Sequence, residues 1–300
     1  MKNPFVTNGY VSPEYFCDRE KETAKIVSLL MNENNIALIS PRRLGKTDLL
    51  RHCFGQPEIK EHYHSFIIDI YATSSVRDFV NVFGKAVLDE LRPKGKSVWS
   101  TFLNVLASLR SEITFDMNGQ PTWGIGLGAI TNPSATLDEI FSYLNNAGKP
   151  CLIAIDEFQQ ITKYADDSNI EAALRTHIQR CSNAHFVFSG SHRHLMGAMF
   201  TSPARPFYQS VTLINLPPIS VDKYAEFCHK NFELAGKRLD TLVVTELYER
   251  FNGITSYMQK VMNILFSMTG AGEICIPSMI DTAINDLLDF SADTYDALLY

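Results

Sequence analysis

Five short apolar runs recur along the chain, and each is rich in Ile, Val, Leu or Phe. They cover residues 36–40, 65–72, 151–155, 185–189 and 211–216. Runs of about four to eight such residues are typical of strands that are buried on both faces. Stretches with apolar residues at helical spacing lie between them, so the chain is predicted to form an α/β domain.

The pattern also predicts how the chain is divided. Helices are expected over residues 98–109 and throughout residues 217–300, which would form a small bundle after a core over residues 1–216. Residues 112–130 differ, because polar and apolar residues alternate on both sides of an Asn-Gly pair. Such a pair is a strong turn signal, so we expect a β-hairpin inserted into the core there.

The composition indicates a soluble globular protein. The chain has 300 residues, of which 45% are hydrophobic, enough to bury a substantial core. Its net charge of −6 argues against a protein that mainly coats nucleic acid. Six cysteines are scattered without a C-x-x-C pair, which is typical of reduced thiols. No apolar leader and no run of about eighteen apolar residues occurs, so we expect a cytoplasmic protein without membrane contact.

The first apolar run leads into a basic loop and then into a helix. The residues are, in order, Ser40, Pro41, Arg42, Arg43, Leu44, Gly45, Lys46, Thr47 and Asp48. Strand, loop and helix in this order are what a phosphate-binding P-loop requires, because backbone N–H groups then converge on an anion. Lys46 would bridge the β- and γ-phosphates, and Thr47 would ligate Mg²⁺. Ser40 stands where the usual pattern has its first glycine.

The third apolar run ends in two adjacent acids, Asp156 and Glu157. Acids at the tip of a buried strand cost free energy unless a cation or a proton transfer requires them. In a nucleotide site, Asp156 would hold Mg²⁺, and Glu157 would activate the water that attacks the γ-phosphate. The alternative is an ordinary strand-to-helix junction, in which Asp156 caps the helix and Glu157 lies in its first turn.

Three further residues are candidates for catalysis. Ser189 and Ser191 lie at the tip of the fourth run, where P-loop ATPases place a polar side chain that senses the γ-phosphate. Arg205 lies between two prolines, which hold it in an extended segment. It would contact the γ-phosphate of its own or a neighbouring subunit, or it is an ordinary surface arginine.

The segment before the first run has two interpretations. Asp18 can cap a helix whose apolar face includes Ile26 and Leu30, and this helix would serve only for packing. Alternatively, the segment closes over the adenine ring with Tyr15 and Phe16, because it directly precedes the P-loop in the chain.

Four motifs together carry a family resemblance. They are a DRExE-like start, ISPRRLGKT, LIAIDEFQQI and FVFSGS. Their combination, over about residues 10–265, resembles the prokaryotic AAA ATPases related to the STAND class, including the archaeal-type ATPase family. The resemblance implies an αβα P-loop NTPase core with a parallel five-stranded sheet in the order 5-1-4-3-2, followed by a helical lid.

The resemblance also implies a site for ATP and Mg²⁺. The nucleotide would be bound by residues 40–48 and the metal by Thr47 and Asp156. The residues expected to take part in hydrolysis are Glu157, Lys46, Ser191, Ser189 and Arg205. One departure concerns the lid, whose usual G-x-P motif falls here on residues 253–255 without its proline. Relatives commonly carry a winged-helix domain beyond the lid, so residues 217–300 would be a lid truncated before it.

The function expected from these residues is Mg²⁺-dependent hydrolysis of ATP to ADP and phosphate, which drives a conformational change. The alternative is a slow nucleotide-gated switch or interaction scaffold. A nucleic-acid-dependent motor is a third hypothesis, which the acidic charge disfavours. The expected partners are ATP or ADP, a protein client and further copies of the chain, and the apolar end over residues 295–300 is a candidate partner-binding tail.

Overall fold

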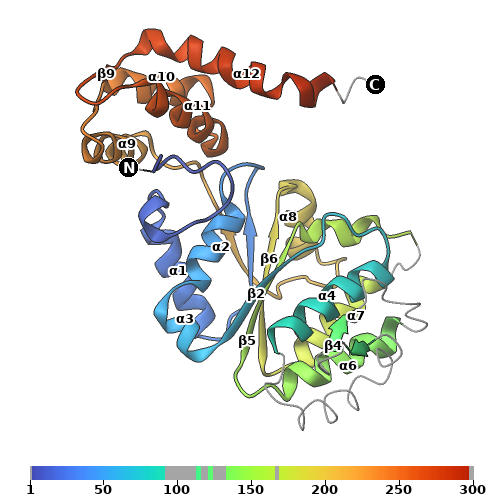
Figure 1. The fold of residues 1–300 in the computed structure, drawn as a ribbon. Coiled ribbons are helices and arrows are strands. Elements are labelled where there is room, and N and C mark those ends of the chain that lie inside the picture. The colour runs from blue at the N-terminus through green and yellow to red at the C-terminus, as the bar shows by residue number, and fades with distance from the viewer. Residues whose placement is uncertain (1, 92–112, 116–120, 124–132, 166–168, 297–300) are drawn as a thin grey trace. The chain divides into compact units, whose positions relative to one another are not determined.

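The computed structural model describes the chain except for residues 1, 92–112, 116–120, 124–132, 166–168 and 297–300 (Figure 1). The chain divides into two compact units. Unit 1 contains Met1–Ala24, Pro41–His52 and Leu216–Tyr300, and unit 2 contains Lys25–Ser40 and Cys53–Asn215. The C-terminal boundary lies beside the predicted one, whereas two N-terminal segments group with the C-terminal helices.

Unit 2 alternates strands and helices along the chain. Its strands are β1 (Ile36–Ile39), β2 (His64–Asp69), β3 (Ile113–Phe115), β4 (Pro121–Trp123), β5 (Cys151–Asp156), β6 (Ala184–Gly190) and β7 (Thr212–Asn215). Its helices are α3 (Pro57–His62), α4 (Val76–Glu90), α6 (Pro133–Asn145), α7 (Ile170–Arg180), α8 (Arg193–Thr201) and the 3-10 helix η3 (Phe158–Lys163). Two more helices, α1 (Glu20–Met31) and α2 (Lys46–Phe54), contain residues of both units.

Five of these strands form one parallel sheet in the order β2-β5-β6-β1-β7. Numbered along the chain and read from β7, this order is 5-1-4-3-2, which confirms the prediction. Strand β1 lies between β6 and β7, while the chain that leaves it continues to β2 at the far edge. Ligands of open α/β sheets bind at such a point, beyond the carboxyl ends of the strands.

Burial on both faces explains the continuous apolar runs of the central strands. Every residue of β5 and β6 is buried. Figure 1 shows α4, α6 and α7 together on one side of the sheet. In the core of this unit, Phe158, Phe188, Phe200 and Phe207 form a cluster whose ring centroids lie 4.4 to 6.1 Å apart.

The inserted strands β3 and β4 pair with each other and not with the main sheet. They are antiparallel, with Ile113 opposite Trp123. This pairing confirms the two arms of the predicted hairpin. Its Asn-Gly turn lies outside the described residues, as does the predicted helix over residues 98–109.

Unit 1 is built mainly from helices. They are α9 (Val221–Leu234), α10 (Thr241–Arg250), α11 (Thr255–Met268) and α12 (Ile280–Asp296), with the 3-10 helices η1 (Pro13–Tyr15) and η4 (Pro277–Met279) and the short parallel pair β8 (Arg238–Leu239) and β9 (Ile274–Cys275). The N-terminal segment belongs to this core, because Phe5 is buried against Phe232 and Phe266. Asn263 donates to the Phe5 carbonyl at 2.7 Å, which ties the segment to α11.

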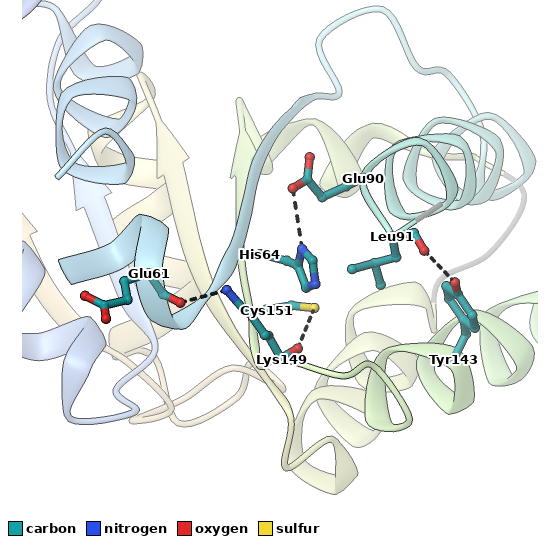
Figure 2. Close-up of polar contacts among 7 residues, drawn as sticks. All are labelled: Glu61, His64, Glu90, Leu91, Tyr143, Lys149 and Cys151. Carbon is teal, nitrogen blue, oxygen red and sulfur yellow. Dashed lines mark hydrogen bonds and ion pairs between the residues drawn. The ribbon is translucent and has the colours of Figure 1, made fainter. Parts of the chain in front are cut away.

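Figure 2 shows polar contacts at the amino edge of the main sheet, where β2 and β5 begin. His64 Nδ1 lies 3.7 Å from Glu90 Oε1, and both side chains are partly exposed. Lys149 Nζ donates to the Glu61 carbonyl at 2.7 Å. The Cys151 thiol points to the Lys149 carbonyl at 3.9 Å. Burial raises the pKa of this thiol to about 12, which makes it unreactive.

Candidate functional site

The carboxyl edge of the sheet in unit 2, where β1, β5 and β6 end, gathers several of the predicted residues. Strand β5 ends at Asp156, Ser189 and Ser191 lie at the end of β6, and Ser40 directly follows β1. The Ser40 N–H donates to the carbonyl of Gly190 at 3.3 Å, so the first residue of the predicted P-loop lies against the end of β6. The parallel pairing of β6 with β1 and with β5 brings these positions together, although Ser40 lies more than a hundred residues before Asp156 in the chain.

Asp156 is a buried carboxylate, with only 7% of its surface exposed. The Ser189 hydroxyl donates to Asp156 Oδ1 at 2.5 Å, and the backbone N–H of Glu157 donates to the same oxygen at 3.0 Å. These hydrogen bonds offset part of the cost of removing a carboxylate from water. A carboxylate oxygen at this position suits a hard cation such as Mg²⁺, which prefers oxygen ligands.

Glu157 has an unusual backbone and a well-held side chain. Its φ is 55°, in the left-handed region that non-glycine residues rarely adopt. The Ser191 hydroxyl donates to Glu157 Oε2 at 2.8 Å, and the side-chain amide of Gln159 donates to the same oxygen. The alternative, in which Asp156 caps the helix that follows, is not seen. The N-cap position of η3 is occupied by Glu157, and no side-chain hydrogen bond caps this helix.

The predicted phosphate loop after Ser40 lies in unit 1, and two of its residues have a left-handed backbone. Gly45 has a φ of 82°, which a residue with a Cβ would adopt only under strain, and Arg43 has a φ of 69°. Helix α2 begins at Lys46, whose ammonium group lies 3.4 Å from the Pro41 carbonyl. The lysine therefore folds back over its own loop, as expected of a residue that would meet a phosphate there.

The loop also contacts the helical bundle of unit 1. The backbone N–H of Ser256, near the start of α11, donates to the Arg43 carbonyl at 3.2 Å. The Arg43 guanidinium lies over the Tyr257 ring, 4.8 Å from its centroid. These contacts involve the residues that directly follow the G-x-P-like position of the lid.

Phe16, the predicted adenine contact, packs on α2. Its ring stacks on His52 with 4.4 Å between centroids, and the Tyr10 hydroxyl lies 3.0 Å from His52 Nδ1. Burial lowers the pKa of His52, which favours the neutral imidazole. One face of Phe16 is therefore covered by protein, and its contact with adenine stays a prediction.

Arg205, the predicted arginine finger, is paired within unit 2. Its guanidinium donates to the carboxylate of Glu171 on α7. Burial raises the pKa of Glu171, and the neighbouring arginine acts in the opposite direction. Neither Arg205 Nε nor Glu171 Oε2 has a hydrogen-bond partner among the described residues. A role for Arg205 at the γ-phosphate stays a prediction, and it would require this ion pair to open.

Two residues of the carboxyl edge were not predicted from the sequence. Gln159 is 3% exposed and binds Glu157, and Gly190 leaves room for it. A Cβ on Gly190 would lie 2.3 Å from Gln159 Oε1 and 2.6 Å from Met196. The sequence feature that could have pointed to Gln159 is its position, two residues after Glu157, the predicted general base.

A comparison with protein families decides what these motifs belong to. The family described as an ATPase domain predominantly from Archaea matches residues 16–261. The chain belongs to this family. No curated protein sequence matches the chain significantly.

Solved structures show that this ATPase domain shares its fold with P-loop ATPases. The Walker-type ATPase PABY2304 of Pyrococcus abyssi is 18% identical, with 99% of this chain and 78% of that chain covered at a TM-score of 0.65. ORC2 of Aeropyrum pernix, solved in ADPNP-ADP complexes, is 14% identical over 95% of this chain and 71% of its own, with a TM-score of 0.62. ORC1 of the same organism, in complex with DNA, is 12% identical over 95% of this chain and 69% of its own, with a TM-score of 0.59.

None of the described helices is both long and apolar enough to cross a membrane. In the same part of the chain, no three His, Cys, Asp or Glu side chains gather as a metal site would require.

Proposed function

We propose that this ATPase domain binds ATP together with Mg²⁺ and hydrolyses it to ADP and phosphate, and that turnover drives a conformational change. The observation that carries the proposal is the carboxyl edge of the sheet. There the buried Asp156 and the tightly held Glu157 lie with Ser189 and Ser191, beside the residue that starts the phosphate loop. Family membership supports the same reaction class.

The proposal gives each residue a chemical role. Lys46 would bind the β- and γ-phosphates, and the Thr47 hydroxyl and the Asp156 carboxylate would hold Mg²⁺. The ion, when bound, would neutralise part of the phosphate charge. Ser191 and Arg205 would sense or stabilise the charge on the γ-phosphate.

The hydrolytic step uses Glu157 as general base. The oxygen of a water molecule forms a bond to the γ-phosphorus, and the bond between that phosphorus and the β–γ bridging oxygen breaks. The proton of the water passes to the Glu157 carboxylate, and ADP leaves with the electron pair of the broken bond.

The second candidate function is a slow nucleotide-gated switch. The contacts of Arg43 with Ser256 and Tyr257 favour it, because they join the phosphate loop to the helical bundle of unit 1. A ligand that moves the loop would change these contacts and so favour a different arrangement of the bundle. A protein client and self-association fit either function. The DNA bound by ORC1 makes nucleic acid a further candidate partner, which the net charge of −6 disfavours.

Thermal unfolding with and without ATP and Mg²⁺ tests nucleotide binding. We expect the nucleotide to raise the melting temperature of the wild type, because a ligand at a hundredfold excess over its Kd adds about 2.7 kcal/mol to the free energy of unfolding. Lys46→Ala should lose most of this rise, because it removes the positive charge at the phosphates. A wild type that shows no rise would contradict the proposal.

Phosphate release separates the two candidates. Multiple turnovers per molecule support hydrolysis as the output, whereas one bound nucleotide per molecule with negligible release supports the switch.

A further inference from the structure

The carboxylate of Glu157 is held through one oxygen only. Ser191 Oγ and the Gln159 amide both donate to Oε2. Among the described residues, no hydrogen bond reaches Oε1. A carboxylate that accepts a proton from water needs one oxygen with an available lone pair and a fixed direction. Two donors on Oε2 give Oε1 that direction.

The donor on Gln159 can be assigned from chemistry. A carboxylate only accepts hydrogen bonds, so the amide group that faces it must be the NH₂ and not the oxygen. This leaves Gln159 Oε1 buried with no hydrogen-bond partner in the part of the chain that the structure describes. A buried amide with one unsatisfied atom costs free energy, so its retention points to a role beyond packing.

The surroundings hold Gln159 in this position. Phe158, its neighbour, is fully buried in the aromatic cluster, and the Gln159 carbonyl accepts from the Thr162 hydroxyl at 2.8 Å. Gly190 provides the space for the amide, since any Cβ there would collide with Gln159 Oε1. The amide therefore approaches Glu157 from a rigid part of unit 2.

The backbone of Glu157 gives the amide a second task. A non-glycine residue at a φ of 55° is strained and needs surrounding contacts to keep it there. The Gln159 amide and the Ser191 hydroxyl are such contacts, because they hold the side chain that this backbone directs.

We propose that Gln159 is a positioning residue for hydrolysis, which together with Ser191 fixes the Glu157 carboxylate so that Oε1 meets the attacking water. The inference rests on the proposed function, because it assigns Gln159 a part in the same reaction. Gln159 does not touch the nucleotide in this scheme and acts through Glu157 alone.

The test compares Gln159→Met with the wild type. Methionine keeps the length of the side chain but lacks the amide donor. We expect kcat for ATP hydrolysis to fall about ten- to a hundredfold, which is the usual effect of losing a hydrogen bond to a charged group. KM and the rise in melting temperature with ATP should stay within about twofold, because binding does not use this contact.

Two further variants make the result specific. Gln160→Met is the matched control, because the Gln160 amide donates to the Thr73 carbonyl at 2.9 Å and not to Glu157. It should keep kcat. If Gln159→Met does not fold, Gln159→Leu, which also lacks the amide donor, takes its place and should show the same fall in kcat with KM for ATP unchanged.

A second readout needs no nucleotide. The NMR signals of the Gln159 side-chain amide, identified by their loss in Gln159→Met, should move in Glu157→Gln, because the charge that they face is removed. If these signals do not move, the Gln159 amide does not contact the Glu157 carboxylate, and the proposal is wrong.

The kinetic outcomes separate this inference from the proposed function. If the wild type hydrolyses ATP and the folded Gln159 variant keeps its kcat, the positioning role is wrong and the ATPase proposal stands. If the wild type binds ATP without turnover, hydrolysis itself is overturned and the positioning role with it.

Discussion

Strands β2 and β5 run side by side through the sheet, yet their two ends differ in chemistry. At the amino edge His64 lies opposite Cys151, and at the carboxyl edge Asp69 lies opposite Asp156. The side chain of His64 is 34% exposed and that of its partner Glu90 is 38% exposed, whereas Asp156 is only 7% exposed.

The two edges also differ in what holds their polar groups. At the amino edge Lys149 donates to the backbone carbonyl of Glu61, and the side chains of His64 and Glu90 pair where both are partly exposed to solvent. At the carboxyl edge a buried acid accepts from a side chain on the neighbouring strand, as Asp156 does from Ser189. Buried charges cost free energy, so a protein retains them mainly where its chemistry needs them. The carboxyl edge is therefore the place where substitution should affect activity, and the amino edge the place where it should not.

The largest expected effect comes from Glu157→Gln. This variant keeps the size of the side chain but removes the base, so kcat for ATP hydrolysis should fall about a hundredfold or more. The rise in melting temperature with ATP and Mg²⁺ should persist, since Glu157 has no role in binding. A phosphate-release assay with the wild type alongside measures the loss. Unchanged turnover would show that another group activates the water.

A smaller effect is expected from Ser189→Ala. It removes the hydrogen bond that the Ser189 hydroxyl donates to the buried Asp156, which should lower the free energy of unfolding by about 1–3 kcal/mol. Ser210→Ala is the matched control, because the Ser210 hydroxyl donates to the neutral carbonyl of Phe207, at 2.7 Å, and not to a carboxylate. Urea unfolding measures both variants. Equal losses of unfolding free energy in the two variants would mean that the hydrogen bond to Asp156 stabilises the fold no more than an ordinary hydrogen bond to a backbone carbonyl.

Acid should destabilise the protein through a histidine near the amino edge. Burial lowers the pKa of His185, near the start of β6, below its usual value of 6.5. As the pH falls through about 6.5, the unfolded chain binds a proton that the folded protein does not bind. The stabilising contribution is therefore complete above this pH and is lost as the pH falls toward the lower folded pKa.

Urea unfolding at about pH 7.5 and about pH 5.5 checks this sign. The loss of stability between these conditions should be smaller in His185→Gln than in the wild type. The exposed His194, replaced in the same way, is the control. An identical loss in His185→Gln and the wild type would contradict the prediction.

The smallest effect is expected at the amino edge itself. His64→Ala, Glu90→Ala and the double variant form a cycle whose coupling energy should be about 0–1 kcal/mol, because solvent screens this half-exposed pair. None of the three should change kcat. A loss of activity in the single variants would remove the contrast between the two edges.

Much of the fold could be predicted because it depends on local patterns. A strand buried on both faces must be apolar throughout, which made β5 and β6 visible as runs. The order of the strands came with the family resemblance, and the pairing of β3 with β4 came from an alternating pattern around a turn signal. The N-terminal segment was harder, because nothing local indicates that Phe5 packs between α9 and α11.

The candidate site divides in the same way. Ser40, Asp156 and Ser189 were predicted from the tips of strands, where parallel pairing brings them to one edge. The Gln159 contact was not predicted, because it depends on a backbone turn at Glu157 that places two nearby side chains face to face. The pairing of Arg205 with Glu171 was missed because 34 residues separate the two in the chain.

The sequence by itself determined the α/β class, the phosphate-loop motif and the two acids at the end of β5, because each is encoded by residue type and spacing over a short segment. Only the tertiary structure decided that Gln159 and Ser191 share one oxygen of Glu157, and that Phe16 stacks on His52. Such contacts depend on distances of a few ångströms between segments whose separation is set by packing. A pattern along the chain specifies which face a residue occupies, whereas packing specifies what it meets there.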